Sequence, residues 1–75
     1  MSESLLRVPA VGTRIRLVAM GEDPDPILPG TEGTVTHLNP WGSPPHDEVQ
    51  IAVDWDNGRS LMLLASVDRW VEIPT

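Results

Sequence analysis

The clearest structural pattern in the sequence lies in Glu48-Val-Gln-Ile-Ala-Val-Asp-Trp-Asp-Asn-Gly-Arg-Ser-Leu-Met-Leu-Leu64. Up to Trp55, apolar residues alternate with polar or small ones, which is the period of a half-buried strand. Asp56-Asn57-Gly58 then interrupts the alternation with residues that are typical of a tight hairpin turn. A second apolar run, from Leu61 to Leu64, follows the turn. The segment therefore predicts a β-hairpin, around which we expect the other strands to pack.

The length of the hairpin turn determines which faces of its two strands become apolar. A two-residue turn would place Leu61 on the face opposite to Val53. A three-residue turn over 56–58 pairs Val53 with Leu61, so that one continuous apolar face results. Because a slip of one residue moves every side chain to the other face, the hydrophobic pattern favours the three-residue turn. Gly58 is then expected to have a positive φ.

Three further strands are expected at residues 13–20, 31–39 and 69–73. A proline-rich loop over residues 21–30 joins the first two of them, and prolines make such a loop stiff. Ile27 and Leu28 are too apolar for a free loop, so we expect one of them to fold back onto the core.

The second of these strands carries two signs of irregular backbone. Gly33 lies inside it, and a glycine within a strand indicates a bulge or a close approach of another chain segment. Val35 and Leu38 are three positions apart, so they cannot both face the core of a regular strand. A bulge near His37 is therefore predicted.

The order of elements is typical of an SH3-like barrel. A second loop is expected at 40–47, and 65–68 is long enough for one 3₁₀ turn before the last strand. The sequence thus predicts an all-β, five-stranded SH3-like barrel over 12–75, with a Pro-rich first loop and a short 3₁₀ turn before the last strand. A partly ordered lead-in over 1–11 is expected to precede it. A chain of 75 residues forms one domain and buries only about 60% of its unfolded surface.

Three motifs carry a resemblance to a known family: Gly12-Thr-Arg-Ile-Arg-Leu17, Pro29-Gly-Thr-Glu-Gly-Thr-Val35 and Val53-Asp-Trp-Asp-Asn-Gly-Arg-Ser-Leu61. In their order and spacing, the sequence resembles a family of small bacterial and phage proteins that is classed as a domain of unknown function. The resemblance covers about residues 12–73 and implies an SH3-like barrel. It implies no activity and carries over no catalytic residue.

The composition limits the classes of partner. The chain has 11 acidic residues against 5 arginines and no lysine, for a net charge of −6. This balance opposes binding to nucleic-acid phosphates and to anionic membranes, so neither is expected as a partner. No apolar run reaches the length of a membrane span, and the first residues lack the features of a signal peptide. The absence of cysteine excludes a disulfide framework and fits a cytoplasmic protein.

The sequence offers no pattern for catalysis or metal binding. His37 and His46 are too few for a histidine-based metal centre. The acidic loop residues Glu22, Asp23 and Asp25 are separated by prolines and lack the spacing of a calcium-binding loop. We therefore expect no catalytic residue, no bound metal and no cofactor.

The favoured hypothesis is a non-enzymatic interaction module. Trp41 lies in the second loop, and Trp70 lies on the side of the last strand opposite to Val71 and Ile73. Each tryptophan either covers an end of the barrel or stands exposed as a contact residue, and exposed tryptophans are common interface anchors. The module would bind a protein partner, of basic character, or a second copy of itself. Its contact residues would be Trp41, Trp70 and the acidic loop residues Glu22, Asp23 and Asp25.

Two alternatives remain open at this point. The first is a nucleic-acid-associated accessory module that resembles KOW-type barrels, with Arg14 and Arg16 as its basic face. The distribution of charge matters more for such binding than the total charge. The second alternative is an enzyme or an accessory subunit of an enzyme, for which the sequence supplies no catalytic motif.

Overall fold

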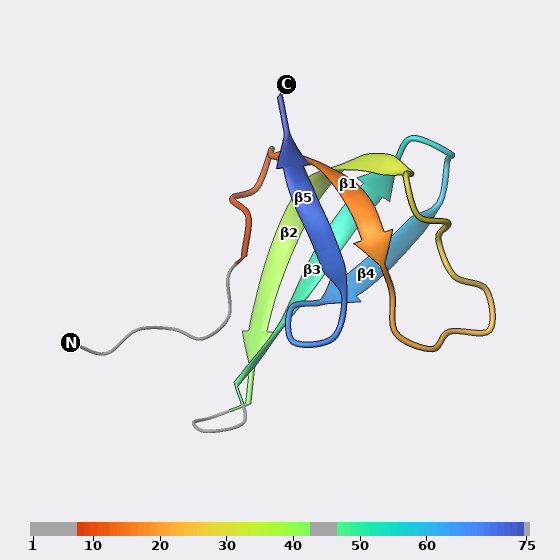
Figure 1. The fold of residues 1–75 in the computed structure, drawn as a ribbon. Coiled ribbons are helices and arrows are strands. Elements are labelled where there is room, and N and C mark those ends of the chain that lie inside the picture. Colours follow the sequence, from red (N-terminus) through yellow and green to blue (C-terminus); the bar gives the residue numbers. More distant parts are fainter. Residues whose placement is uncertain (1–7, 43–46, 75) are drawn as a thin grey trace.

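Five strands form one antiparallel sheet in the computed structural model, which describes residues 8–42 and 47–74 (Figure 1). The strands are β1 (Arg14–Ala19), β2 (Glu32–Trp41), β3 (Glu48–Trp55), β4 (Ser60–Leu64) and β5 (Arg69–Ile73). Their order in the sheet is β4-β3-β2-β1-β5, so the first and last strands are neighbours. This arrangement confirms the predicted all-β, SH3-like barrel. Within the described residues β4 and β5 are the two edges of the sheet, and no ladder joins them.

The hairpin of β3 and β4 has the predicted register. Val53 pairs with Leu61, and the amide of Trp55 donates to the carbonyl of Arg59 at 3.0 Å. The amide of Gly58 donates to the carbonyl of Trp55 at 2.9 Å, and Gly58 has a φ of 89°. The three-residue turn and the left-handed glycine are therefore confirmed.

The predicted bulge in β2 is also present. The register between β2 and β3 shifts between Val35 and His37. Val35 is fully buried, and Leu38 packs against the core. The extra residue of the bulge reverses which side chains of the second half of β2 face the core. Val35 and Leu38 therefore both reach the interior despite their odd spacing.

β2 is longer than the sequence predicted. Pro40 pairs with Val49 and Trp41 with Glu48, so the placement of Pro40 and Trp41 in a loop was wrong. β1 pairs with β2 only as far as Thr34, and a strand that lacks a neighbour on one side tolerates proline. The ends of β2 and β3 therefore project from the barrel as a two-stranded extension (Figure 1). Trp41, at its tip, is 54% exposed.

The core fills the space between the curved sheet and the first loop. Of the two apolar residues in that loop, Ile27 is 1% exposed and Leu28 is 70% exposed. The prediction that one of them folds back onto the core is confirmed. The buried apolar side chains are Ile15, Leu17, Ile27, Val35, Ile51, Val53, Trp55 and Leu63.

β5 turns towards the core the side that carries Trp70, which is opposite to the side of Val71. Trp70 pairs with Leu17 of β1 and packs against the core, whereas Val71 is 45% exposed. Paired residues of neighbouring strands share a face, so Trp70 lies on the same side as the buried Leu17. The register with β1 decides this orientation, and it cannot be read from the alternation within β5.

A buried carboxylate joins the first loop to the turn between β4 and β5. The amide of Val67 donates to the carbonyl of Leu64 at 3.1 Å, which is the i to i+3 spacing of a 3₁₀ turn. Asp68 is 8% exposed. Its Oδ1 accepts from the amide of Gly21 and its Oδ2 from the amide of Leu64, each at 2.7 Å. Asp68 thus connects the beginning of the loop, the end of β4 and the beginning of β5.

Replacing Asp68 with asparagine is expected to lower the free energy of unfolding by about 1–2 kcal/mol. The amide keeps the shape of the side chain, but its NH₂ group faces a backbone N–H that needs an acceptor, and a buried unpaired donor costs about this much. Urea denaturation checks the prediction, with Asp54→Asn on the exposed side of β3 as the matched control. Equal midpoints for the two variants would contradict it.

Part of the predicted lead-in lies outside the described residues, namely residues 1–7, and so does His46. In the described part of the lead-in, Pro9 is buried and Val8 is 38% exposed. The amide of Gly12 donates to the carbonyl of Val35 at 2.7 Å, which attaches this segment to β2.

Candidate functional site

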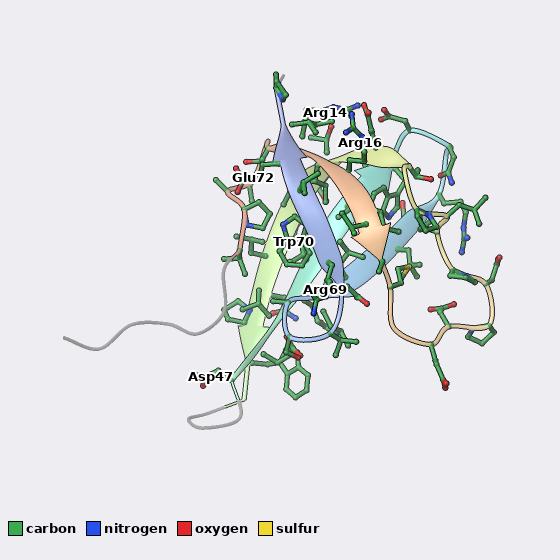
Figure 2. The ribbon with its side chains drawn as sticks, in the orientation of Figure 1. Arg14, Arg16, Asp47, Arg69, Trp70 and Glu72 are labelled. Carbon is green, nitrogen blue, oxygen red and sulfur yellow. The ribbon has the colours of Figure 1, made fainter. Side chains whose placement is uncertain are left out.

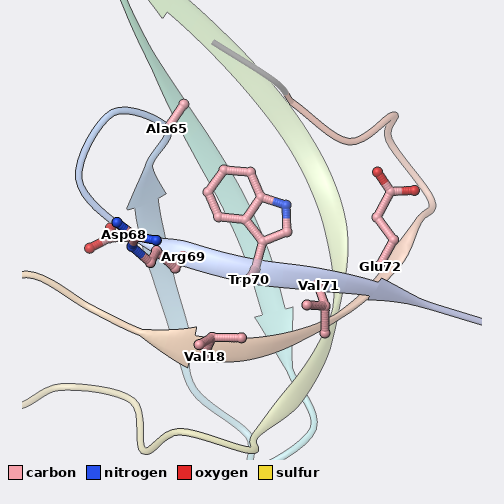
Figure 3. Close-up of a pocket in the computed structure, with 7 residues that line it drawn as sticks. All are labelled: Val18, Ala65, Asp68, Arg69, Trp70, Val71 and Glu72. Atoms are coloured by element: carbon pink, nitrogen blue, oxygen red, sulfur yellow. The ribbon is translucent and has the colours of Figure 1, made fainter.

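An open hollow of about 660 Å³ lies along β5 (Figure 3). β1 contributes Val18 to its lining, and the turn before β5 contributes Ala65 and Asp68. The rest of the lining is the segment 69–72 of β5 itself. Because three separate segments meet here, the hollow depends on the pairing of β1 with β5 and on the turn that Asp68 holds.

The alternation of β5 places different chemistry on its two sides. Figure 3 shows the Trp70 ring and the Glu72 side chain on one side of the strand, and Val18 and Val71 on the other. Val18 and Val71 are 47% and 45% exposed, and Trp70 is half-buried. The hollow therefore offers an aromatic ring and two aliphatic side chains to a ligand.

The charged groups of the hollow are two carboxylates and one guanidinium. Both oxygens of Asp68 accept hydrogen bonds from backbone amides. Glu72 and Arg69 are exposed, and the ion pairs among the described residues involve neither of them. Glu72 is thus the carboxylate of the hollow that can meet a cation of a ligand.

The acidic part of the first loop lies apart from this hollow. Glu22, Asp23 and Pro24 line a depression of their own, of about 530 Å³. The carboxylate of Asp23 accepts from the amide of Asp25 at 2.8 Å, and Arg59 donates to the carbonyl of Asp25 at 2.8 Å. These bonds order the loop, and its acidic side chains remain at the surface.

The structure does not gather the five predicted contact residues into one site. Trp70 lines the hollow along β5, and Trp41 is the last residue of β2, where it pairs with Glu48 at the end of the β2–β3 extension. The hollow that Trp70 lines includes none of the acidic loop residues Glu22, Asp23 and Asp25. Each of the five lies on the surface or in a hollow, but they form separate surfaces.

Sequence reasoning missed the aliphatic wall of the hollow. Val18 belongs to β1 and Val71 to β5, and neither was singled out from the sequence as a contact residue. The only available signal was that three consecutive residues, Leu17 to Ala19, are apolar in a strand with period two. One of them must then face outwards.

The two arginines proposed for a nucleic-acid face are both bound to carboxylates. Arg14 donates two hydrogen bonds to Asp56, at 2.8 and 2.5 Å, and Arg16 donates to Glu32 at 2.9 Å. The hydrogen bonds from Arg14 hold the pKa of Asp56 below its ordinary value, and the same contact raises the pKa of Arg14. Figure 2 shows Arg14 and Arg16 at one end of the barrel, with Arg69 farther along β5.

Acid is expected to destabilise the fold through two surface carboxylates. Hydrogen bonds from Arg14 lower the pKa of Asp56 below 3.8, and a hydrogen bond from the Ser66 hydroxyl lowers that of Glu48 below 4.5. These hydrogen bonds therefore stabilise the fold fully when the pH is above the ordinary pKa values of the two carboxyl groups. Their contribution is lost as the pH falls through the lowered pKa values of the folded protein. The melting temperature should be level from neutral pH to about 5 and fall below it. Asp56→Asn should show a shallower fall, and an unchanged fall would contradict the assignment.

A third depression lies on the outer face of β2, β3 and β4, on another part of the sheet. Its volume is about 520 Å³, and Met62, which is 53% exposed, contributes to its lining with Thr36, His37, Ala52, Val53, Asp54 and Ser60. Met62 is therefore a suitable control position for substitutions in the hollow along β5.

Among residues 8–42 and 47–74, no three side chains of His, Cys, Asp or Glu gather closely enough to hold a metal ion. In the same part of the chain, no helix has the length and apolar character needed to cross a membrane.

Comparison with known proteins identifies a family and no characterised relative. No curated protein and no solved structure gives a significant match to the chain. A family model described as "Domain of unknown function (DUF4314)" matches residues 3–73. The predicted resemblance to a domain of unknown function is therefore confirmed. Because the match covers nearly the whole chain, the protein belongs to the DUF4314 family.

Proposed function

We propose that this domain is a non-enzymatic protein-binding module and that the hollow along β5 is its binding site. The observation that supports this best is one hollow that combines the half-buried Trp70 and the Glu72 carboxylate on one side of β5 with the exposed Val18 and Val71 on the other. Tryptophan is one of the residue types enriched at the hot spots of protein interfaces, which lie in well-packed pockets. The aliphatic neighbours would exclude water from the contact.

The chemistry of the hollow favours binding over catalysis. Its apolar members, among them Val18, Trp70 and Val71, have no groups that transfer protons or attack a substrate. Asp68 has both carboxylate oxygens engaged by backbone amides, which fits a structural role. A binding surface accounts for all of these side chains.

The charge of the chain favours a basic protein partner. The net charge is −6, and the first loop adds Glu22 and Asp23 to the surface. Charges at the rim of an interface mainly raise the rate of association with an oppositely charged partner. A second copy would carry the same net charge, so we propose a different, basic protein as the partner, in the cytoplasm.

The proposal is tested by capturing partners from the native host, identifying one by mass spectrometry and measuring its binding as a purified protein. Val71→Ser in the hollow is compared with Met62→Ser, since both side chains are exposed apolar residues on edge strands. We expect Val71→Ser to weaken binding at least about tenfold and Met62→Ser to leave it within about twofold. Equal effects of the two substitutions would contradict the assignment of the site.

The domain is expected not to bind duplex DNA or RNA appreciably at about 0.15 M salt. Non-specific affinity requires several cations that displace counterions from phosphates, and Arg14 and Arg16 are already paired with Asp56 and Glu32. Fluorescence anisotropy with labelled random oligonucleotides checks this. Micromolar binding that is lost on replacing both arginines with alanine would instead support the nucleic-acid alternative.

A further inference from the structure

Among the residues that the structure describes, β5 has a strand partner on one side only, and some of its main-chain N–H and C=O groups point to the other side. The amide of Leu17 donates to the carbonyl of Thr31 at 2.9 Å, and the carbonyl of Leu17 accepts from the amide of Gly30 at 2.8 Å. Both polar groups of Leu17 thus point away from β5. In an antiparallel ladder the partner of such a residue also turns both groups away. The N–H and C=O of Trp70, and those of Glu72 two residues later, therefore face the open edge of β5.

The opposite edge of the sheet is closed where β4 ends, and within residues 8–42 and 47–74 nothing closes β5 in the same way. The amide of Leu64 donates to Asp68, and its carbonyl accepts from the amides of Val67 and Asp68. The turn and loop hydrogen bonds of the described residues use neither the amide nor the carbonyl of Trp70 or Glu72. An edge with such groups is a template for the addition of another strand.

The hollow lies along this same edge, so a ligand in it would meet the main chain of β5. An added strand sends alternate side chains to the two sides of the sheet. On one side they would meet the Trp70 ring and the Glu72 carboxylate, and on the other Val71 and Arg69. These neighbours suit an extended segment whose basic residues lie on the side of Glu72 and whose apolar residues lie on the side of Val71.

We infer that the partner contributes an extended, basic segment that adds as a sixth strand to the open edge of β5. This inference rests on the proposed function and specifies its partner and mode of binding. Hydrogen bonds to the main chain of Trp70 and Glu72 supply affinity. The Trp70 ring and the Glu72 carboxylate, which contact the side chains of the added strand, supply specificity. The net charge of −6 on the domain, with Glu72 at the edge, selects the basic segment.

The first test measures amide hydrogen exchange in the full ¹⁵N-labelled chain with and without a peptide in which lysine alternates with valine. At saturating peptide, exchange at the amides of Trp70 and Glu72 is expected to slow at least about tenfold. Two further peptides carry N-methyl groups, one on every lysine and the other on every valine. Alternate amides of a strand point to opposite edges, and only one edge of the added strand pairs with β5. One of the two methylated peptides should therefore fail to bind, and the other should still bind.

The second test uses Glu72→Pro and its matched control Glu72→Ala. The amide of Glu72 faces the open edge, so proline removes a donor for the added strand without removing a bond to β1. Both variants lose the carboxylate, and both are checked for folding by their melting temperatures. Glu72→Pro is expected to bind the peptide at least about tenfold more weakly than Glu72→Ala.

The outcomes separate this inference from the proposed function. If the peptide perturbs Trp70 but exchange at both amides and binding of both N-methylated forms are unchanged, strand addition is refuted and the hollow remains the site. If the peptide fails to bind at millimolar concentration while Val71→Ser weakens the captured partner, the basic extended segment is refuted. If the amides are protected without peptide as the protein concentration rises, a second copy occupies the edge and the inference fails.

Discussion

Replacing Ile27 with alanine is expected to lower the free energy of unfolding by about 3 kcal/mol, within the range of about 2–5 kcal/mol for buried isoleucine. Ile27 is 1% exposed although it lies in a loop. It fills the interior of the barrel between the strands, and its amide donates to the sulfur of Met20 at 3.3 Å. A domain of this size has modest stability, so the loss would be a large share of the total.

The loop cannot easily collapse to fill the space that the alanine leaves. The amide of Gly30 donates to the carbonyl of Leu17 at 2.8 Å, and Arg59 donates to the carbonyls of Asp25 and Pro26. These bonds fix the backbone on both sides of Ile27, which keeps the cavity open.

Leu28→Ala is the matched control, because Leu28 is the next residue and is 70% exposed. Its effect should stay within about 0.5 kcal/mol, as is usual for surface substitutions. Urea denaturation of both variants measures the two effects. Similar losses for both would mean that Ile27 does not occupy the core in solution.

Replacing Gly33 with alanine is expected to cost about 2–3 kcal/mol, near the upper end of overpacking effects. A β-carbon at Gly33 would lie 2.7 Å from Cγ1 of Val53, 2.9 Å from the carbonyl oxygen of Asp54 and 2.9 Å from Cε3 of Trp55. Val53 and Trp55 are buried, and Asp54 presents backbone. None of the three can move without disturbing the β2–β3 ladder or the core.

Gly21→Ala is an informative control for this substitution. Its β-carbon would come 2.6 Å from Cγ1 of Val67, which is closer than any contact at Gly33. Val67, however, lies in a turn and is 53% exposed, so its side chain can rotate away. We expect Gly21→Ala to cost less than about 1 kcal/mol. If thermal denaturation gave Gly21→Ala the larger loss, the tight packing of β2 against β3 at Gly33 would be refuted.

Local patterns were sufficient to predict much of the fold. The register of the hairpin follows from period two and from the residues of its turn, which lie close together in the sequence. The bulge near His37 follows from the spacing of Val35 and Leu38. The role of Ile27 follows from its apolar character in a polar loop.

The errors arose where the pairing of distant strands decides the outcome. Pro40 and Trp41 have the composition of a loop, but β2 can extend through them because β1 no longer flanks it there. Trp70 faces the core because it pairs with Leu17, more than fifty residues away in the sequence. No periodicity within β5 contains that information.

The candidate site was predicted only in part for the same reason. Trp70 could be singled out by residue type, but the Val18 and Val71 wall forms only when β1 and β5 pair. Likewise, Arg14 forms an ion pair with Asp56, which is 42 residues away in the sequence. Contacts of this kind follow from topology, and composition alone does not supply them.

The most direct test of the binding site is a chemical-shift map of the ¹⁵N-labelled domain, recorded as an identified partner is added. We expect the largest changes at Val18, Ala65 and the segment 69–72, which surround the hollow along β5. Largest changes at Trp41, or around Met62 on the outer face of β4, with β5 unaffected, would contradict it.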